Sequence, residues 1–208
     1  MAGKTGNRRQ EILQTLARML EKQNTKITTA SLASELDISE AALYRHFPSK
    51  AKMFESLIDF AEETIFSRIK SISAESDDSL NKCNRIINLV LNFCSKNPGI
   101  TRLLIGNSLV SEYESLNTRI KSIHEKLTQN FKAILAVRQN NMGDLIKYSV
   151  DDLANLFTNL IEGKINSFVR SDFNKDPLTN FNSQWQMIKD GIESVSYTHL
   201  TLPTKEGG

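Results

Sequence analysis

The sequence predicts an all-α fold, and three features of its 208 residues lead to that prediction. The chain has only 9 Gly and 4 Pro, too few for a β-sandwich or barrel, which needs turn residues about every 8–12 positions. Its apolar residues recur at the i, i+3, i+4 spacing of amphipathic helices over most of its length. With 39% hydrophobic and 24% charged residues, it also has enough apolar side chains to form a buried core. We therefore expect about nine helices.

The first part of the chain predicts a cluster of short helices followed by a long one. Thr28 or Thr29 can cap the second helix, and Ser39 is a good N-cap for the third. Pro48 then ends the cluster, because proline cannot continue a helix, and Ser49 caps the long helix. The helices expected here cover residues 8–21, 30–36, 40–46 and 50–73.

The remainder predicts further helices separated by polar breaks. Pro98 ends the fifth helix, and Gly99 after it tolerates the positive φ of a chain reversal. The polar segments 74–79 and 139–144 are predicted to be a linker and a loop. The helices expected here cover residues 80–96, 100–105, 107–138 and 150–170, with a last one inside 178–195. Residues 196–208 lose helical periodicity, and we expect a non-native or disordered tail.

Several classes of protein are excluded by what the sequence lacks. It has no run of 18 apolar residues, which argues against integral membrane association, and no apolar N-terminal segment, which argues against secretion. Cys83 and Cys94 fall in one helical pattern too far apart to be bridged, and we expect reduced thiols in a core. No catalytic motif and no metal-ligand spacing occurs, so we expect no enzyme activity, no cofactor and no metal.

The segment 28–50 has the layout of a helix-turn-helix, in which two short helices are joined by a tight turn behind a leading helix. Leu43 and Phe47 are four residues apart, so they share the inward face of the second short helix. That arrangement leaves Ala41, Tyr44 and Arg45 facing outward. An arginine can bond bidentately to guanine in the major groove, and a tyrosine can reach a phosphate. The pattern therefore predicts binding to double-stranded DNA.

Charge and hydroxyl groups around this segment favour the same function. Residues 1–50 carry eight Lys and Arg against five Asp and Glu, an excess of positive charge larger than that of the whole chain. Threonine, serine and lysine at the helix starts can contact the DNA backbone. The residues expected to contact DNA are Thr28, Thr29, Ser39, Ala41, Tyr44, Arg45, His46 and Lys50.

The stretch from Ile27 to Met53 resembles the TetR family, with Thr-Thr, Leu-Ala and then Ser-Glu-Ala-Ala-Leu-Tyr-Arg-His-Phe-Pro-Ser-Lys. Asp37 stands in the turn where the family usually has Gly, and Asp is among the few residues that tolerate a left-handed φ. The resemblance implies an N-terminal three-helix, helix-turn-helix DNA-binding domain and a C-terminal helical regulatory and dimerisation domain. The DNA-binding domain is expected over residues 8–50 and the regulatory and dimerisation domain over residues 74–195, with a connecting helix over residues 50–73.

Segments 54–58, 97–102 and 167–173 resemble the branch of the TetR family that acts in nucleoid occlusion. This likeness implies a sequence-specific, homodimeric DNA-binding protein of the cytoplasm, associated with the nucleoid, that inhibits assembly of the division protein FtsZ there. A groove between the fourth and fifth helices is then expected to bind the acidic C-terminal tail of FtsZ. The matching positions are Phe60, Arg68, Leu89, Lys96 and Asn97.

Helical geometry gives a separate, weaker indication for Phe60, which lies about 125° from the centre of the apolar stripe of its helix. An off-stripe aromatic side chain can be a partner contact. The alternative is a central helix buried on several sides, because Phe66 is off-stripe in the opposite direction.

The wide apolar face of residues 150–170 also has two interpretations. It is either an ordinary core face or, together with the last helix, half of a four-helix dimer interface. The residues expected at that interface are Leu153, Phe157, Leu160, Gly163, Lys164, Trp185 and Ile188. An alternative function is a TetR-type transcriptional repressor that a small-molecule effector releases from DNA, which would need a ligand cavity among the C-terminal helices.

Overall fold

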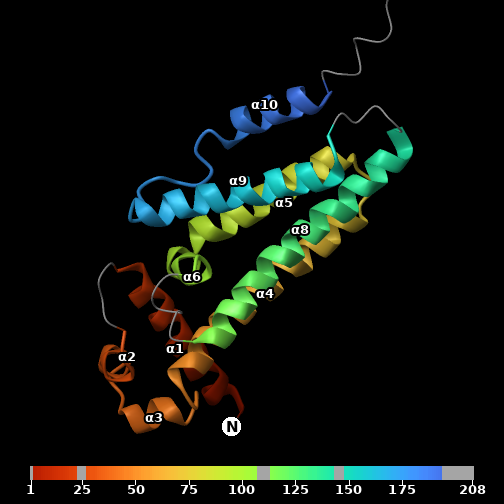
Figure 1. Ribbon diagram of the computed structural model, residues 1–208. Coiled ribbons are helices and arrows are strands. Elements are labelled where there is room, and N and C mark those ends of the chain that lie inside the picture. Colours follow the sequence, from red (N-terminus) through yellow and green to blue (C-terminus); the bar gives the residue numbers. More distant parts are fainter. Residues whose placement is uncertain (1, 23–26, 107–112, 143–147, 194–208) are drawn as a thin grey trace, which may run out of the picture.

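The computed structural model describes residues 2–22, 27–106, 113–142 and 148–193, and within them the chain forms nine helices and no strand (Figure 1). The all-α prediction is thereby confirmed. The start of the helix expected at 107 and the tail expected at 196–208 lie outside the described residues. The helices are α1 (Ala2–Glu21), α2 (Thr29–Glu35), α3 (Glu40–Tyr44), α4 (Lys50–Ala74), α5 (Ser79–Lys96), α6 (Pro98–Leu104), α8 (Glu114–Met142), α9 (Val150–Arg170) and α10 (Phe181–Glu193).

The helices form a small head and a longer body (Figure 1). Helices α1, α2 and α3 gather at one end, and α4 leads from them into the body, where α8 runs along it. Helices α4, α5, α8 and α9 pack against one another, and α10 lies on the outside next to α9. Helix α6 lies between head and body, since it packs against α1 on one side and against α4, α5 and α9 on the other.

Side-chain caps position the short helices of the head. Thr28 and Ser31 form a reciprocal capping box at the start of α2, and Ser39 accepts a hydrogen bond from the Ala42 amide at the start of α3. Asp37 adopts the left-handed φ of 52° expected at the turn. Helix α3 is shorter than predicted, because it ends at Tyr44 and Arg45 is its C-cap.

The prediction for Gly99 was wrong. This residue lies inside α6, which begins at Pro98, and not in a chain reversal. Its lack of a side chain matters because α1 passes so closely that a Cβ atom at position 99 would lie 1.9 Å from the carbonyl oxygen of Ala17. Close helix approach, and not backbone conformation, therefore requires glycine here.

The opposite side of α6 is fixed by Arg102, a nearly buried side chain. Its guanidinium lies 4.7 Å from the centre of the Phe173 ring and forms an ion pair with Asp172 at 3.2 Å. Both partners have positive φ, 49° and 63°, in the segment that follows α9. Helix α6 is thus fixed on one side to the head and on the other to the end of α9.

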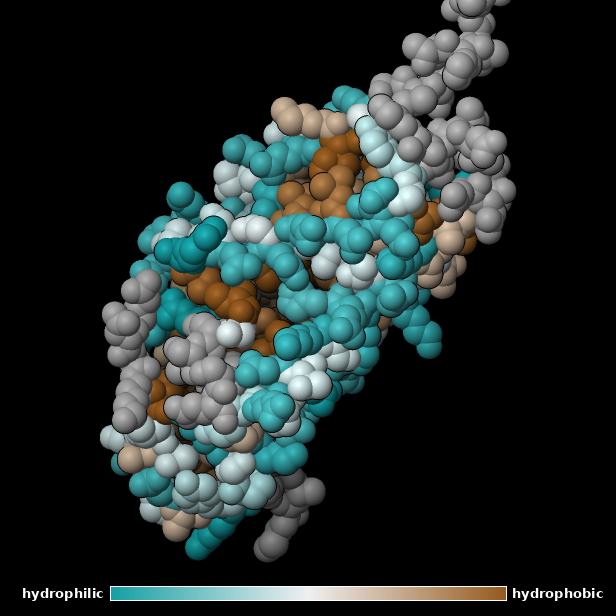
Figure 2. Space-filling model, in the orientation of Figure 1, coloured by the Kyte–Doolittle hydropathy of each residue, from teal (hydrophilic) through white to brown (hydrophobic). Residues whose placement is uncertain are grey.

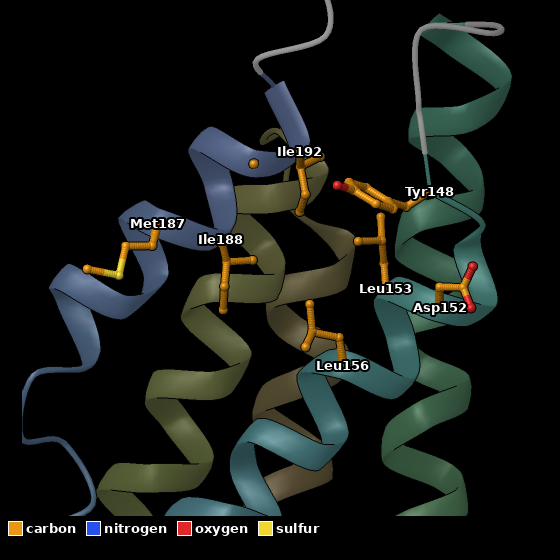
Figure 3. Close-up of a pocket in the computed structure, with 8 residues that line it drawn as sticks. Tyr148, Asp152, Leu153, Leu156, Met187, Ile188 and Ile192 are labelled. Atoms are coloured by element: carbon orange, nitrogen blue, oxygen red, sulfur yellow. The ribbon is translucent and has the colours of Figure 1, made fainter.

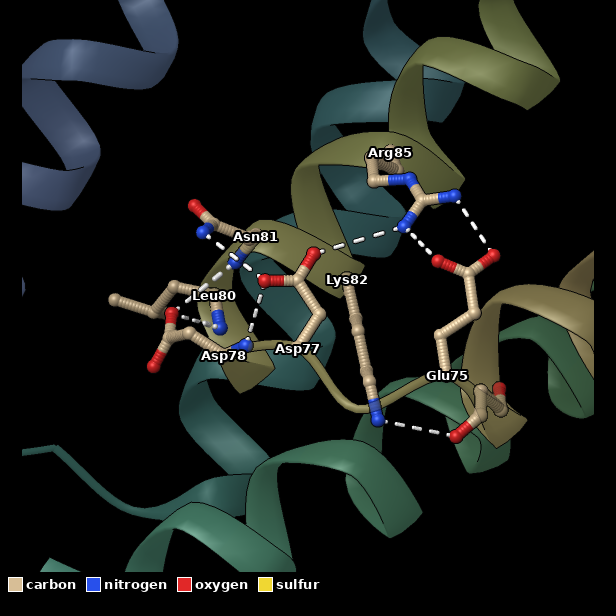
Figure 4. A network of polar contacts seen from close by, with 8 residues as sticks. Glu75, Asp77, Asp78, Leu80, Asn81, Lys82 and Arg85 are labelled. Carbon is tan, nitrogen blue, oxygen red and sulfur yellow. Dashed lines mark hydrogen bonds and ion pairs between the residues drawn. The ribbon is translucent and has the colours of Figure 1, made fainter.

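The polar segment predicted as a linker is a short turn with a dense set of polar contacts (Figure 4). Asp78 caps α5 by accepting hydrogen bonds from the Leu80 and Asn81 amides. Arg85 pairs with Glu75 and Asp77, so it joins the two ends of the turn. Lys82 donates to the Ser73 carbonyl oxygen at 3.1 Å.

Helix α8 extends further than predicted. It continues to Met142, so the loop expected over 139–144 is wrong for residues 139–142, while 143–147 lie outside the described residues. The extension is physically reasonable, because the segment contains no Gly or Pro before Gly143.

Ion pairs join α8 to α4 at the half-buried carboxylate of Glu62. Arg119 donates to it at 2.8 Å, and Lys126 makes a second, shorter ion pair. Burial alone would raise the pKa of Glu62, but the hydrogen bonds from Lys126 and Arg119 together lower it below its usual value.

Candidate functional site

The head presents the outer side of α3 to solvent, as the sequence predicts. Tyr44 is 46% exposed, and Ala41 and Arg45 are also exposed, whereas Leu43 and Phe47 on the other side are buried in the core. The exposed arginine forms no ion pair within the described residues, so its guanidinium is available to a ligand.

A hydrogen-bonded chain joins this exposed side of α3 to the start of α2. The Thr29 hydroxyl donates to the Glu40 carboxylate at 2.6 Å, and the Tyr44 hydroxyl lies 3.4 Å from the Thr29 oxygen, to which it donates. The sequence analysis did not identify Glu40, whose role depends on contact between the two helices. These contacts direct the Tyr44 hydroxyl toward the start of α2.

The other residues predicted to contact DNA lie around the exposed side of α3, and several of them also stabilise the head. The Thr28 and Ser39 hydroxyls cap α2 and α3, so these residues serve the fold independently of any contact with DNA. His46 and Lys50 are half-buried, and the Lys50 ammonium lies 5.4 Å from the centre of the Phe54 ring. All eight predicted DNA contacts therefore belong to the α2–α3 unit or to the first turn of α4.

Arg9 is a further basic residue of the head, and it is not among the DNA contacts predicted from the sequence. Its guanidinium lies 4.4 Å from the centre of the Phe47 ring, and it donates to the Ser56 hydroxyl at 3.3 Å. The charge excess of residues 1–50 includes this arginine, but the spacing of the motif gives no reason to select it. The contacts place a cation of α1 beside the end of the α3 segment.

The second predicted surface lies where α4 and α5 meet. Phe60 is 50% exposed, and its ring centre lies 6.1 Å from that of Phe93 on α5. Asn97 donates to the Phe93 carbonyl oxygen at 2.8 Å, next to the exposed Lys96. The structure therefore brings Phe60 and Asn97 to one site, and Lys96 precedes Asn97 at the end of α5.

The two other residues predicted for this surface lie further along the same pair of helices. Leu89 is half-buried against the core, one turn from Phe93, and Arg68 is exposed about two turns from Phe60. Neither Arg68 nor Lys96 forms an ion pair within the described residues. The surface thus combines one exposed aromatic ring with two cations that have no carboxylate partner among the residues that the structure describes.

A groove of about 270 Å³ begins at Phe60 and extends toward the head. Part of its wall comes from α1, which the sequence analysis did not connect with this surface. The other wall comes from α4, from α6 and from Asn97, which precedes α6. Its lining residues are Gln10, Leu13, Gln14, Ala17, Leu57, Phe60, Asn97 and Ile100.

Two of the residues predicted for the dimer interface, Phe157 and Trp185, lie inside the core of the chain itself, and for them the prediction was wrong. Phe157 is fully buried, with its ring centre 5.5 Å from that of Phe131 and 5.4 Å from that of Trp185. Trp185 is nearly buried as well, with its ring packed on Phe157 and Phe181. Phe157 and Trp185 cannot line a surface between two protomers, because the side chains that cover them belong to the same chain. Leu153 is also nearly buried, but it lines a hollow on the outer side of α9 and α10.

The other four residues predicted for the interface keep accessible surface. Leu160 and Ile188 are half-buried, and a Cβ atom added at Gly163 would meet no atom within 4 Å. Lys164 donates to the Thr179 carbonyl oxygen at 3.1 Å, and burial lowers its pKa.

The outer side of α9 and α10 has an apolar hollow of about 230 Å³ (Figure 3). Leu153, Leu156, Ile188 and Ile192 converge there from the two helices, and Figure 2 shows apolar side chains gathered between α9 and α10. Leu156 is 45% and Met187 72% exposed. The sequence analysis named neither as a surface residue.

The body also contains an apolar cavity of about 40 Å³, which Phe66, Cys94 and His124 help to line. Both cysteines are buried free thiols, as predicted, and burial raises the pKa of Cys94 to about 11. Among the described residues, no group of His, Cys, Asp and Glu could hold a metal ion, and no helix is long and apolar enough to cross a bilayer.

Two family descriptions match this chain. Residues 12–57 match "Bacterial regulatory proteins, tetR family", and residues 77–193 match the SlmA-like "Tetracyclin repressor-like, C-terminal domain". Solved structures agree on the fold. MbdR from Azoarcus sp. superimposes with a TM-score of 0.75 at 17% identity, covering 88% of this chain and 97% of that one. Bacillus subtilis FadR, solved with stearoyl-CoA, gives 0.68 at 15% identity, covering 88% of this chain and 98% of that one.

Curated relatives are far more similar in sequence. The nucleoid occlusion factor SlmA of Alteromonas mediterranea is 47% identical over 189 residues, which is 90% of this chain and 97% of the relative. SlmA of Idiomarina loihiensis is 45% identical over 198 residues, 94% of this chain and 100% of the relative. The chain therefore belongs to the TetR family and, within it, to the SlmA group.

Proposed function

We propose that this protein is a nucleoid occlusion factor. It binds specific chromosomal DNA sites as a homodimer and, when bound there, inhibits assembly of the FtsZ ring over the nucleoid. The observation that carries this proposal is the exposed Tyr44–Arg45 edge of α3, in a chain 47% identical to a named nucleoid occlusion factor over 90% of its length. The protein acts in the cytoplasm, on the nucleoid.

The DNA-reading unit is residues 8–50. Tyr44 is oriented by Thr29 and Glu40, so the ring reaches a phosphate with little loss of side-chain freedom. Arg45 reads a base edge in the major groove, and Lys50 contacts the backbone. The helix over 50–73 connects this unit to the regulatory and dimerisation unit over 74–195.

The homodimer forms through the outer side of α9 and α10. Leu160, Gly163, Lys164 and Ile188 retain accessible surface there, and the exposed Leu156 and Met187 extend the same apolar region. A solvent-exposed apolar hollow on two adjacent helices is favourable to association, because a second copy removes it from water. The dimer holds two reading units at the spacing of about 34–36 Å that successive major grooves require.

FtsZ binds at the surface formed by Phe60, Leu89, Lys96 and Asn97, with Arg68 further along α4. The exposed Phe60 ring supplies apolar contact, and the two unpaired cations attract an acidic peptide such as the FtsZ C-terminal tail. None of these five residues lies in the DNA-reading unit, so one protomer can contact both partners.

The alternative function, a repressor released by a small effector, fits less well. Pockets for drug-sized ligands have volumes of about 300–1,000 Å³, whereas the apolar cavity inside the body measures about 40 Å³. A space of that size holds one or two water-sized groups. The cavity that the described residues of α4, α5, α8 and α9 enclose is therefore too small for a drug-sized effector.

The proposal is tested with the full-length protein, a labelled FtsZ tail peptide and genomic duplex fragments. Phe60→Ala is expected to abolish peptide binding and to leave DNA binding unchanged. The matched control is Phe66→Ala, on the same helix but inside the body, which keeps both activities if the variant folds. If Phe60→Ala removes both activities, or neither, the assignment of the two surfaces is rejected. If the unaltered protein binds no tail peptide, the FtsZ part of the proposal fails.

A further inference from the structure

Glu40 is an acidic side chain on the surface that the DNA-reading unit presents to its ligand. It begins α3 and lies four residues before Tyr44, so the two side chains share the exposed side of the helix. Its exposed carboxylate lies 2.6 Å from the hydroxyl of Thr29, which in turn lies 3.4 Å from the Tyr44 hydroxyl. A negative charge is therefore placed next to two side chains that are expected to contact DNA.

One oxygen of this carboxylate has no partner among the residues that the structure describes. Thr29 donates to Oε2, whereas Oε1 accepts no hydrogen bond, and Glu40 forms no ion pair with any lysine or arginine of the described chain. The carboxylate thus approaches DNA with its charge uncompensated and with one acceptor atom free.

A structural role alone does not account for the charge. A glutamate in the first turn favours a helix, and its bond to Thr29 joins α3 to α2. A glutamine could make the same bond without carrying a negative charge toward the phosphates, which repel a carboxylate. The charge is therefore unfavourable for binding unless the DNA itself supplies a donor.

Cytosine supplies the most suitable donor in the major groove. An ionised carboxylate only accepts hydrogen bonds, and the base edges in this groove offer two donors, the N4 amino group of cytosine and the N6 amino group of adenine. Adenine N6 lies between two acceptors, its own N7 and O4 of the paired thymine. Cytosine N4 has an acceptor on one side only, O6 of the paired guanine, so a carboxylate meets less repulsion there.

We propose that Glu40 is a specificity-determining residue whose carboxylate accepts a hydrogen bond from the N4 amino group of a cytosine in the major groove. Thr29 holds Oε2, and Oε1 is left for the base. The inference rests on the proposed function, because it takes α3 to be the helix that enters the groove. Where no cytosine lies within reach, the carboxylate loses water without gaining a donor. Glu40 thus lowers the affinity for every other sequence.

The first test compares the bases that two forms of the protein select. The unaltered protein and Glu40→Gln each select duplexes from a randomised pool. Glutamine bonds bidentately to adenine, so one position that holds cytosine for the unaltered protein is expected to hold adenine for Glu40→Gln. Glu35→Gln is the matched control, because Glu35 is an exposed glutamate of α2 whose side chain makes no hydrogen bond or ion pair within the described residues. It is expected to select the same duplexes as the unaltered protein.

The second test leaves the protein unaltered and changes the DNA. Each cytosine of the selected half-site is replaced in turn by N4-methylcytosine, which still pairs with guanine but has a methyl group in place of the amino hydrogen that faces the major groove. At one position the unaltered protein is expected to bind about tenfold or more weakly. Glu40→Ala is expected to bind the methylated and unmethylated duplexes equally, and to bind a scrambled duplex more tightly than the unaltered protein does.

The outcomes separate this inference from the proposed function. If no methylated cytosine weakens binding by the unaltered protein, the contact with cytosine is overturned even where a variant fails to fold. If Glu40→Gln and Glu40→Ala weaken binding to all duplexes equally, Glu40 only joins α2 to α3, and the inference is again overturned. In both cases the proposed DNA binding stands. If the unaltered protein enriches no duplex from the pool, the proposed DNA binding itself has failed.

Discussion

Replacing Gly99 by alanine tests the close approach of α6 to α1 of the head. A Cβ atom at position 99 would lie 1.9 Å from the Ala17 carbonyl oxygen, about 1.5 Å short of ordinary contact, and 3.1 Å from the Leu20 Cβ. The obstacle is backbone, so no side-chain rotation relieves it, and α6 must move away from α1. Overpacking of this kind costs typically about 1–3 kcal/mol, and we expect about 3 kcal/mol here because both elements are helices.

The assay is urea and thermal unfolding at a fixed protein concentration. For a chain of this size, about 3 kcal/mol corresponds to a fall in Tm of about 6–12 °C. Gly191→Ala is the matched control, because a Cβ atom there would meet nothing within 4 Å. It is expected to be neutral or to stabilise by up to about 1 kcal/mol through helix propensity. A Gly99→Ala protein that unfolds within about 0.5 kcal/mol of the unaltered chain would refute the reasoning about the α1–α6 contact.

Four further predictions concern other parts of the molecule. Arg45→Ala should weaken specific DNA binding by about 1–3 kcal/mol, whereas Lys50→Ala should mainly lower the salt slope by about one unit; equal, negligible effects in binding titrations would contradict the proposed docking. Met187→Arg, at a 72% exposed position, should give folded monomers in sedimentation experiments, and a persistent dimer would remove α10 from the interface. The pKa of Glu62 is lowered in the folded protein, so the ionised carboxylate stabilises the fold above the unfolded pKa of 4.5, and this stabilisation is lost as the pH falls through the folded pKa. Glu62→Gln should therefore lose less unfolding free energy on acidification than the unaltered protein. Parallel curves of unfolding free energy against pH for the two proteins would contradict this prediction. The Cys94 thiol, 1% exposed and with its pKa raised to about 11, should react with a thiol reagent only as fast as the protein opens, and rapid labelling of the native state would contradict its burial.

Much of the head could be predicted from sequence because its determinants are local. The caps at Thr28 and Ser39, the left-handed Asp37 and the inward pair Leu43 and Phe47 all follow from residue chemistry within a few positions. The same is true of α9, whose bounds agree with the prediction because Ser149 and two acidic residues mark its start.

The predicted interface shows where this reasoning stops. Helical periodicity identifies an apolar face, but it does not tell which element covers that face. Phe157 and Leu156 are neighbours on α9, yet one is covered by Phe131 and Trp185 of its own chain and the other is 45% exposed.

The sequence by itself determined the helical class, the helix-turn-helix and the outward position of Tyr44 and Arg45, since spacing and capping act over one or two turns. Only the tertiary structure decided that Gly99 is required by α1, that Arg102 attaches α6 to the end of α9, and that α1 forms part of the wall of the groove at Phe60. Each of these depends on the distance between elements far apart in the chain, and that distance is set by the packing of the whole core.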